Sequence, residues 1–447
     1  MFKRKAYNKL LEWKNNYNGK RAALLEGARR VGKTTVAEEF AKNEYKSFIK
    51  IDFANVSTEI RELFNDISNL DRFFLRLQVE TEITLYQRNS VILFDEVQLF
   101  PKARQAIKYL VLDGRYDYIE TGSLISIKKN VKDILIPSEE FKINIYPMDY
   151  EEFLWALDGN SEILKTISQN AEPVGNSTNN TLMRNFRLYM AIGGMPQAVE
   201  AYLEKNNFEY VDAVKRDILN LYFEDLKKID KSGRLSDIYK SVPSQLALKK
   251  KRFVITSATK KAKTLKDEER LFDLIDSGLV LPCYHVTEPS ITLSQTKEYD
   301  NFKLYLSDIG LYTTMLFNNK NGINPDIYKK LLSNKLEANL GYLYENVIAQ
   351  MLVASGYDLY FFTWQKENST HYYEIDFLLA NKNKIIPIEV KSSSVRTHES
   401  LDEFCKKYSN FVKDAYLFSQ KDKSTKGVIK MFPIYTFPFW LDFFYKI

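Results

Sequence analysis

Apolar and polar residues alternate along the first 150 positions in two kinds of block. Short apolar runs, typical of buried strands, are separated by stretches in which apolar positions recur every three or four residues, as on one face of a helix. This alternation predicts an α/β fold, a parallel sheet flanked by helices. The expected strands are 22–26, 47–53, 90–95, 116–121 and 141–146, and the expected helices include 70–85 and 103–112.

The pattern changes after residue 150. It becomes helical over 150–157, 181–191 and 210–226, with a polar loop at 175–180. Residues 235–320 mix short helices with expected strands at 278–286 and 302–306. Beyond Pro325 we expect one helix over 333–356, three short strands, a helix near 400–408 and more strands. We therefore predict four parts, with the bounds 1–150, 151–232, 233–325 and 326–447.

The first expected strand leads into the segment Gly-Ala-Arg-Arg-Val-Gly-Lys-Thr, residues 27–34. It fits the phosphate-binding loop G-x-x-x-x-G-K-[ST], in the strand–loop–helix setting that the loop needs. The two glycines let backbone N–H groups face a phosphate, the lysine adds charge toward the β- and γ-phosphates, and the threonine hydroxyl can bind Mg²⁺. The residues assigned to ATP binding here are Gly27, Arg30, Gly32, Lys33, Thr34 and Thr35.

An acidic pair, Asp95-Glu96, ends the apolar strand 90–95. Polar residues at the carboxyl edge of a parallel sheet lie where its ligands bind. We expect Asp95 to hold Mg²⁺ together with Thr34, and Glu96 to act as the general base on water. Thr121 or Ser123, at the end of the next strand, orients the water or contacts the γ-phosphate, or else belongs to an ordinary turn.

A second group of candidate residues lies near the C-terminus: Glu345, Asp376, Glu389 and Lys391. Glu389 and Lys391 share one face of an expected strand, and a hairpin through 381–384 would bring Asp376 to Glu389. Glu345 falls within a helical apolar stripe and should face inward. Carboxylates around a divalent cation, with a lysine to position water, suit phosphodiester hydrolysis. Three interpretations stay open: an active nuclease, a fold kept for binding, and ordinary surface residues.

One strand of this group contains an awkward residue. Pro387 precedes Glu389 by two positions, and proline is unwelcome inside a central strand. We expect it to mark a bulge or the start of the strand.

Together these motifs resemble the AAA-type ATPases with a C-terminal DUF4143 region. Further matching pieces are Thr-Gly-Ser at 121–123, Gly-Gly-Met-Pro at 193–196 and Lys-Leu-Tyr-Leu-Ser-Asp-Ile-Gly-Leu at 303–311. The resemblance implies a P-loop ATPase domain over 1–150, a winged helix over 233–325 and a PD-(D/E)xK nuclease-like domain over 326–447. In that last domain Glu345, Asp376 and Glu389 would bind the metal, and Asp376, Glu389 and Lys391 would be catalytic.

The chain departs from this family after the Thr-Gly-Ser strand. Many relatives have a Leu-x-Gly-Arg piece there, whereas residues 134–140 read Ile-Leu-Ile-Pro-Ser-Glu-Glu. An arginine that stabilises the transition state would have to be Arg104, Arg115 or another, or be absent.

Charge is distributed unevenly. The net charge is +6, yet residues 227–270 hold fourteen Lys or Arg against five Asp or Glu, chiefly in clusters at 249–252 and 260–263. Such a surface can bind nucleic-acid phosphates, or simply be solvated. Two cysteines and no apolar run long enough for a bilayer favour a cytoplasmic protein without disulfides or a membrane partner.

These observations predict a nucleotide switch. ATP–Mg²⁺ at Lys33, Thr34 and Asp95 would set the state of a DNA-binding or DNA-cleaving C-terminal domain, and hydrolysis through Glu96 and Lys33 would reset it. ATP and DNA are the expected partners, and self-association is left open. Two alternatives remain: a nucleotide-dependent DNA-binding regulator without cleavage, and a protein-remodelling ATPase whose C-terminal domain docks a protein.

Overall fold

The computed structural model describes residues 1–17, 19–123, 137–170, 172–248, 252–259, 266–317, 325–336, 340–392 and 398–444. The chain divides into two compact units. Unit 1 is Met1–Tyr146 with Asp276–Gly278, and unit 2 is Pro147–Ile275 with Leu279–Ile447. Among the helices of the described ranges, none is both long and apolar enough to cross a bilayer.

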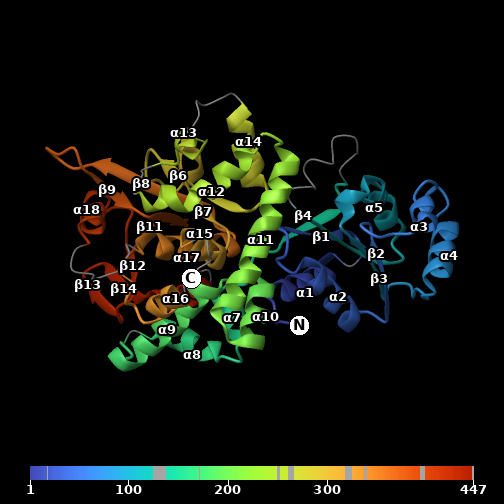
Figure 1. Cartoon of the computed structure of the whole chain (residues 1–447), viewed down its shortest axis with the longest axis horizontal. Helices are drawn as coiled ribbons and strands as arrows, with labels where there is room; N and C mark the ends of the chain where they lie inside the picture. The colour runs from blue at the N-terminus through green and yellow to red at the C-terminus, as the bar shows by residue number, and fades with distance from the viewer. Residues whose placement is uncertain are drawn as a thin grey trace. The chain divides into compact units, whose positions relative to one another are not determined.

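Unit 1 is built on a five-stranded sheet in the order β2-β3-β4-β1-β5. Figure 1 labels β1, β2, β3 and β4 of this sheet. Every neighbouring pair is parallel, so the expected α/β class is confirmed. Because β4 lies between β1 and β3, the carboxyl ends of these three strands meet at one edge. The strands are β1 (Ala22–Gly27), β2 (Ser47–Asp52), β3 (Ser90–Asp95), β4 (Asp117–Ser123) and β5 (Glu140–Asn144).

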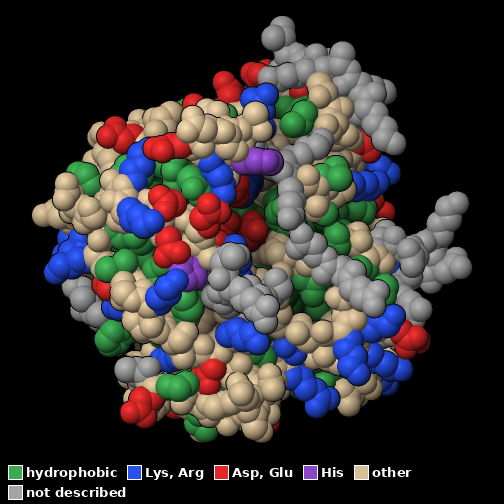
Figure 2. Space-filling view, turned by 90° about the vertical axis from the view of Figure 1, so that its left-hand side faces the viewer, with side chains coloured by type: hydrophobic (Ala, Val, Ile, Leu, Met, Phe, Trp, Pro, Cys, Tyr) green, Lys and Arg blue, Asp and Glu red, His purple; other side chains and the backbone are tan. Residues whose placement is uncertain are grey.

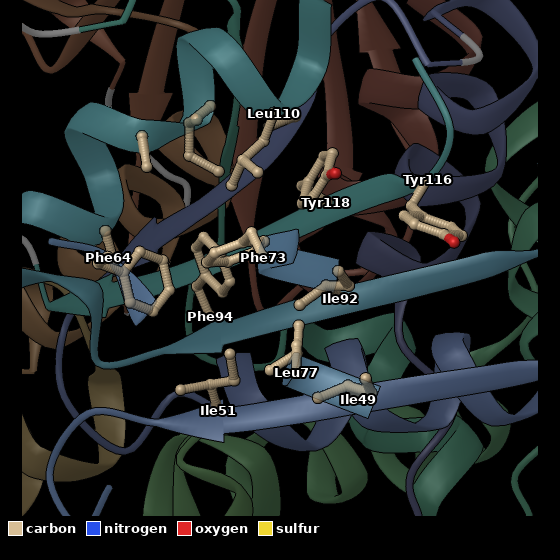
Figure 3. Packing of buried hydrophobic residues seen from close by; sticks show 14 of the residues in the cluster. Ile49, Ile51, Phe64, Phe73, Leu77, Ile92, Phe94, Leu110, Tyr116 and Tyr118 are labelled. Carbon is tan, nitrogen blue, oxygen red and sulfur yellow. The ribbon is translucent and has the colours of Figure 1, made fainter. Parts of the chain in front are cut away.

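An aromatic-rich core packs against this sheet (Figure 3). Phe94 of β3 and Phe73 of α4 each meet Phe64 edge-on, at centroid distances of 5.7 and 5.3 Å. The expected helix 70–85 stops at Thr81, because Glu82 adopts the left-handed conformation with φ 54°. The helices of unit 1 are α1 (Lys5–Tyr17), α2 (Lys33–Glu44), α3 (Thr58–Leu63), α4 (Leu70–Thr81), η1 (Val97–Leu99) and α5 (Pro101–Asp113).

Helices dominate the first half of unit 2. The loop expected at 175–180 is wrong: only Gly175, with φ 88°, is outside the helix, and α9 begins at Asn176. Packing of its Met183 and Phe186 outweighs the local preference of asparagine for turns. The helices are α7 (Tyr150–Ala156), α8 (Ser161–Gln169), α9 (Asn176–Ile192), α10 (Pro196–Lys205), α11 (Phe208–Ile229), α12 (Arg234–Ala247), α13 (Ile255–Thr259) and α14 (Lys266–Asp276).

The single helix expected over 333–356 is also wrong. Asn334 has φ 56° after the end of α16, and α17 begins only at Gly341. Gly356, with φ 89°, follows the end of α17 as expected. The remaining helices are α15 (Ile309–Leu316), α16 (Pro325–Leu332), α17 (Gly341–Ala354), α18 (Glu399–Lys407), η2 (Leu293–Gln295), η3 (Ile434–Thr436) and α19 (Phe437–Phe444).

Two sheets complete unit 2, in the orders β7-β6-β8-β9 and β10-β11-β12-β14-β13. Strand β6 pairs with β7 on one side and, in parallel, with β8 on the other. Strands on either side of residue 325 therefore share one sheet. The strands are β6 (Val280–Val286), β7 (Lys297–Leu306), β8 (Leu359–Gln365), β9 (Tyr372–Ile375), β10 (Phe377–Asn381), β11 (Lys384–Val390), β12 (Ala415–Ser419), β13 (Ser424–Lys426) and β14 (Ile429–Pro433).

Pro387 lies inside β11, opposite Leu378 of β10, and neither starts the strand nor forms a bulge. The sheet tolerates it because the Ile385 N–H points away from β10, to the Phe411 carbonyl, and position 387 faces the same way. The ladder to β12 begins only at Ile388. The proline therefore lacks a backbone N–H at a position where that N–H would make no hydrogen bond to either neighbouring strand.

Two of the glycine-containing motifs pack against each other. The Gly194 N–H donates to Asp308 Oδ2 at 2.7 Å, and Asp308 Oδ1 caps α15 through the Leu311 N–H. A Cβ on Gly310 would lie 2.2 Å from the Ile192 carbonyl oxygen. The end of α9 and the start of α15 thus approach closely enough to require glycine.

We expect Gly194→Ala to destabilise the protein by about 3 kcal/mol, because its Cβ would lie 2.0 Å from the Met148 carbonyl oxygen. Urea unfolding of unit 2 measures this loss. The control is Gly233→Ala, where the Cβ would meet nothing within 4 Å and only the left-handed backbone, with φ 77°, costs about 1 kcal/mol. Equal losses in the two variants would contradict the steric explanation.

Candidate functional site

The conformation of the glycine loop after β1 requires glycine at two positions. Gly32 has φ 92°, and a Cβ on Gly27 would lie 2.2 Å from the Ile145 carbonyl oxygen. Lys33, the first residue of α2, folds back so that its Nζ donates to the carbonyls of Ala28 (2.8 Å) and Gly27 (3.2 Å). Burial lowers the pKa of Lys33 to about 8. A phosphate bound in this loop would place a negative charge beside the Lys33 ammonium and so favour its charged form.

Asp95 connects the loop to the strand ends. Its Oδ1 accepts from the Thr34 hydroxyl at 2.7 Å and from the Thr121 hydroxyl at 2.5 Å. The pair expected to hold Mg²⁺ therefore lies together, and its hydroxyl and carboxylate oxygens are of the kind that Mg²⁺ prefers. Lys50 of β2 contacts the other oxygen of Asp95 at 3.0 Å and Glu38 at 2.7 Å. Sequence reasoning missed Lys50, since a single lysine in a strand gives no signal.

The remaining residues assigned to this site lie around the same edge. Glu96 has φ 53°, its N–H donates to Thr121 Oγ1 at 3.3 Å, and its carboxylate accepts from the Gln98 amide. Ser123 is buried and stands in register with Gly27 across β4 and β1. Arg30, with φ 69°, and Thr35 are exposed on the loop and the first turn of α2.

The two arginines considered for the transition state are already engaged. Arg104 is buried and makes two hydrogen bonds of 2.7 Å to Glu140. Arg115 contacts both Asp113 (2.7 Å) and Asp71 (2.6 Å). Both guanidinium groups are thus paired with carboxylates of the same unit. In the segment 134–140, where the sequence departs from the Leu-x-Gly-Arg pattern, residues 134–136 lie outside the described residues.

In unit 2 the predicted hairpin forms between β10 and β11, with Asn381 opposite Lys384. Asp376, between β9 and β10, accepts from the Val390 N–H at 2.7 Å. Glu389 Oε1 pairs with Lys391 at 2.5 Å. The hairpin thus brings the expected acidic strand to the Glu-x-Lys strand.

A cavity of about 880 Å³ opens beside these residues. Glu345 of α17, Asp376 and Lys391 line it. Glu389 is buried, and its Oε2 accepts no hydrogen bond from the described part of the chain. Among the described residues no three His, Cys, Asp or Glu side chains are arranged to hold a metal ion as they stand, so binding one would require side-chain movement. The other lining residues include Asn176, Asn179, Asn180, Arg187, Gln420 and Lys421.

Two residues of this cluster, both on β7, were missed by sequence reasoning. Lys303 of β7 pairs with Glu374 and lies 3.9 Å from Glu345. Tyr305, two residues on, donates its hydroxyl to Glu345 Oε2 at 3.0 Å. The sequence feature that could have indicated Lys303 is its place in the expected strand 302–306, whose other residues are aromatic or apolar.

Burial and mutual repulsion shift the pKa values of this cluster. Desolvation raises the pKa of Glu345, and Lys303 partly opposes the shift. Desolvation and the neighbouring Glu345 raise the pKa of Asp376 well above its usual value. Burial raises the pKa of Glu389 too, against the effect of Lys391. Burial lowers the pKa of Lys303, but the carboxylates Glu374, Glu345 and Asp376 outweigh this and raise it. The ionised form of these carboxyl groups is therefore disfavoured in the folded protein.

Surface charges of both signs meet on the side of the molecule that carries α18 and β13. Figure 2 shows Asp and Glu side chains near the middle of this face, with Lys and Arg side chains beside them. This face does not present a field of one sign.

Part of the basic middle segment is internally neutralised. Arg234 pairs with Asp267 at 2.5 Å, and Arg270 pairs with Asp230 (3.0 Å) and Asp267 (2.9 Å). These arginines hold α12 and α14 together. Of the two clusters at 249–252 and 260–263, Arg252 alone lies within the described residues and is exposed.

Comparisons with known proteins divide the chain into three matched regions. A family model described as an AAA domain matches residues 19–154. Two described as domains of unknown function, DUF8612 and DUF4143, match 183–322 and 340–437. The DUF8612 match crosses the expected boundary between 232 and 233. No curated protein matches the chain.

Several solved structures resemble the chain weakly. PCH-2 from C. elegans is 14% identical, over 49% of this chain and 70% of that one, with a TM-score of 0.28. CDC6P from Pyrobaculum aerophilum is 12% identical, over 74% and 94%, with a TM-score of 0.25. Pif1 helicase from Candida albicans is 10% identical (TM-score 0.22), and the match covers 42% of this chain and only 55% of the helicase. Scores this low add nothing to the argument from strand order.

The strand order, the glycine loop and the Thr34–Asp95 contact give unit 1 the fold of a P-loop nucleotide hydrolase. The AAA match covers the same residues, and the DUF4143 match covers the hairpin that carries Asp376 and Glu389. The chain therefore combines an AAA-type ATPase domain with a C-terminal DUF4143 domain.

Proposed function

We propose that this ATPase is a nucleotide switch for a metal-dependent phosphodiester-cleaving centre in the DUF4143 domain, and that its substrate is DNA. The division at residues 150, 232 and 325, with a winged-helix-like third part, belongs to this proposal. The observation that carries it is the gathering of Glu345, Asp376 and Lys391 at one cavity. Nearby, Glu389 Oε2 accepts no hydrogen bond from any residue that the structure describes.

At the first site, Thr34 and Asp95 would hold the Mg²⁺ of ATP–Mg²⁺, which neutralises phosphate charge. Lys33 leaves the carbonyls of Gly27 and Ala28 for the phosphates. Glu96 takes the proton of the attacking water, and Thr121 fixes the Glu96 backbone. Ser123, opposite Gly27, contacts the γ-phosphate.

At the second site, Asp376 and Glu389 would hold a divalent cation, with Glu345 completing the acidic wall. When bound, that ion supplies Lewis-acid activation of the scissile phosphate. Lys391 lies on Glu389 and orients the water that attacks phosphorus. Exposed lysines and arginines of residues 227–270 would neutralise neighbouring phosphates along the DNA.

The switch is tested by Glu96→Gln. This variant should bind ATP but hydrolyse it about 10²–10⁴-fold more slowly, because the general base is lost. Nicking of supercoiled plasmid with Mn²⁺ is then compared in ATP, ADP and a non-hydrolysable analogue. We expect Glu96→Gln with ATP to match native protein with the analogue, and both to differ from ADP.

Nicking at one rate in every nucleotide state would refute the switch. Absence of nicking with any metal, while salt-sensitive DNA binding persists, would leave the non-cleaving regulator. If the protein neither nicks nor binds DNA, the result would support the alternative of a protein-remodelling ATPase.

A further inference from the structure

A buried arginine lies in the wall of the cavity of about 880 Å³. Arg187 of α9 lines this cavity and is 7% exposed. Its Nε and Nη2 donate to Gln420 Oε1, at 3.2 and 2.7 Å, and its Nη1 donates to the Leu332 carbonyl at 3.1 Å. Both partners are neutral, and no ion pair joins Arg187 to a carboxylate in the part of the chain that the structure describes. A buried cation held by neutral groups favours an anion beside it.

Asn179, on the same helix, supplies a hydrogen-bond acceptor. It is 4% exposed and lines the same cavity. Its Nδ2 donates to the Gln420 carbonyl at 3.0 Å, and this orients the amide, because a carbonyl can only accept. The other amide atom, Oδ1, accepts no hydrogen bond from any described residue. The α9 wall, formed by Arg187 and Asn179, therefore offers a ligand both a cation and an acceptor.

Gln420 joins the α9 wall to the proposed cleavage centre. It directly follows β12, and its Nε2 donates to the Ser392 carbonyl. Ser392 and its neighbour Lys391 line the cavity too. A ligand bound to the α9 wall would therefore share one cavity with Lys391.

The size of the cavity suits a single nucleotide. Its volume of about 880 Å³ lies within the range of small-ligand pockets, roughly 300–1,000 Å³. Paired bases stay stacked inside a duplex, whereas an unpaired nucleotide can turn out of the stack into a recess. An unpaired base also exposes N–H groups that pairing would occupy. A nucleotide thus carries a phosphate that suits Arg187 and a donor that suits Asn179.

We propose that this cavity receives one unpaired nucleotide of a DNA strand, with its phosphate on Arg187 and a base N–H on Asn179 Oδ1. This rests on the proposed function, in which DNA is the substrate, and specifies that the bound strand is unpaired. The α9 wall lies outside the DUF4143 match: Arg187 falls within the DUF8612 match, and Asn179 within none of the three. The helical region thereby determines which DNA the cavity binds.

Two DNA probes test this on the full chain, in EDTA so that binding is measured without cleavage. One is a fluorescein-labelled duplex, and the other is the same duplex with a short single-stranded gap. Fluorescence anisotropy gives the affinity for each. We expect native protein to bind the gapped duplex at least about tenfold more tightly, the effect of one charge-assisted contact. Arg187→Gln should lose this preference and keep native affinity for the paired duplex.

Salt dependence separates the loss of a phosphate contact from misfolding. With the gapped probe, the slope of log K against log salt should become shallower by about 0.7 in Arg187→Gln, the value for one single-strand phosphate. Asn179→Ala should weaken binding of the gapped probe by about threefold to tenfold at an unchanged slope. The controls Arg184→Gln and Asn185→Ala change exposed positions of α9 and should keep the native preference.

Equal affinity of native protein for the two probes, or a native preference in both Arg187→Gln and Asn179→Ala, would overturn the inference alone. If Arg187→Gln loses both probes through misfolding, a native preference in Asn179→Ala is enough to overturn it. Native protein that prefers the gap but nicks DNA with no metal would refute the proposed cleavage and support the inference. Native protein that binds neither probe would overturn both the inference and DNA as the substrate.

Discussion

Lys33→Ala is expected to lower ATP turnover by about 10²–10³-fold, because the transferring phosphoryl group loses a preorganised cation. The lysine already lies within the glycine loop, so it has only to turn from the carbonyls of Gly27 and Ala28 to the phosphates. Phosphate release under saturating ATP measures turnover, and a fluorescent ATP analogue measures affinity. Both should fall.

The control for this variant is Lys42→Ala, an exposed lysine in the last turn of the same helix. It should retain native turnover. A Lys33→Ala protein that still hydrolyses ATP at a native rate would mean that nucleotide is handled elsewhere.

Asp376→Asn is expected to abolish Mn²⁺-dependent nicking, by at least about 10³-fold, while ATP turnover stays native. The ligand charge at the cluster is lost, and with it several kcal/mol of transition-state stabilisation. The amide oxygen can still accept from the Val390 N–H, so the hairpin should keep its geometry. Asp414→Asn, a half-exposed aspartate paired with Lys430, is the matched control and should nick normally.

Stability gives this second variant an independent readout. The folded state raises the pKa of Asp376, so the folded protein binds the proton more tightly than the unfolded chain does. Ionisation above the unfolded pKa of about 4 then favours unfolding. The amide introduced by Asp376→Asn cannot ionise, so this variant should melt at or above the native temperature at pH 8 by differential scanning calorimetry, and lose this advantage toward pH 4. A marked drop in melting temperature at pH 8 would show that Asp376 is structural.

The glycine loop and its acidic partner could be predicted from the sequence because both depend on local geometry. Gly27, Gly32 and Lys33 are close in the chain, and the apolar run before Asp95 identifies a buried strand on its own. The contact of Thr34 with Asp95 follows once the strands are parallel, since their carboxyl ends meet at one edge. The hairpin that carries Asp376 to Glu389 was predictable for the same reason, as a short-range turn.

Long-range contacts escaped sequence reasoning. Lys50 meets Asp95 across neighbouring strands, and Lys303 reaches Glu374 from a strand seventy-one positions away in sequence. Single lysines in strands carry no periodic signal, and pairing between distant strands is fixed by packing. Arg104 and Arg115 looked available in sequence, but Glu140, Asp113 and Asp71 engage them in the folded chain.

The sequence by itself determined a phosphate-binding strand–loop–helix, the α/β class and an acidic hairpin, because each is written in residues a few positions apart. Only the tertiary structure decided that β6 and β8 share a sheet and that α17 starts at Gly341. It alone placed a buried lysine of β7 among the C-terminal carboxylates. The physical reason is that burial and strand pairing are properties of the whole core, and a buried charge finds its partner wherever packing brings one within reach.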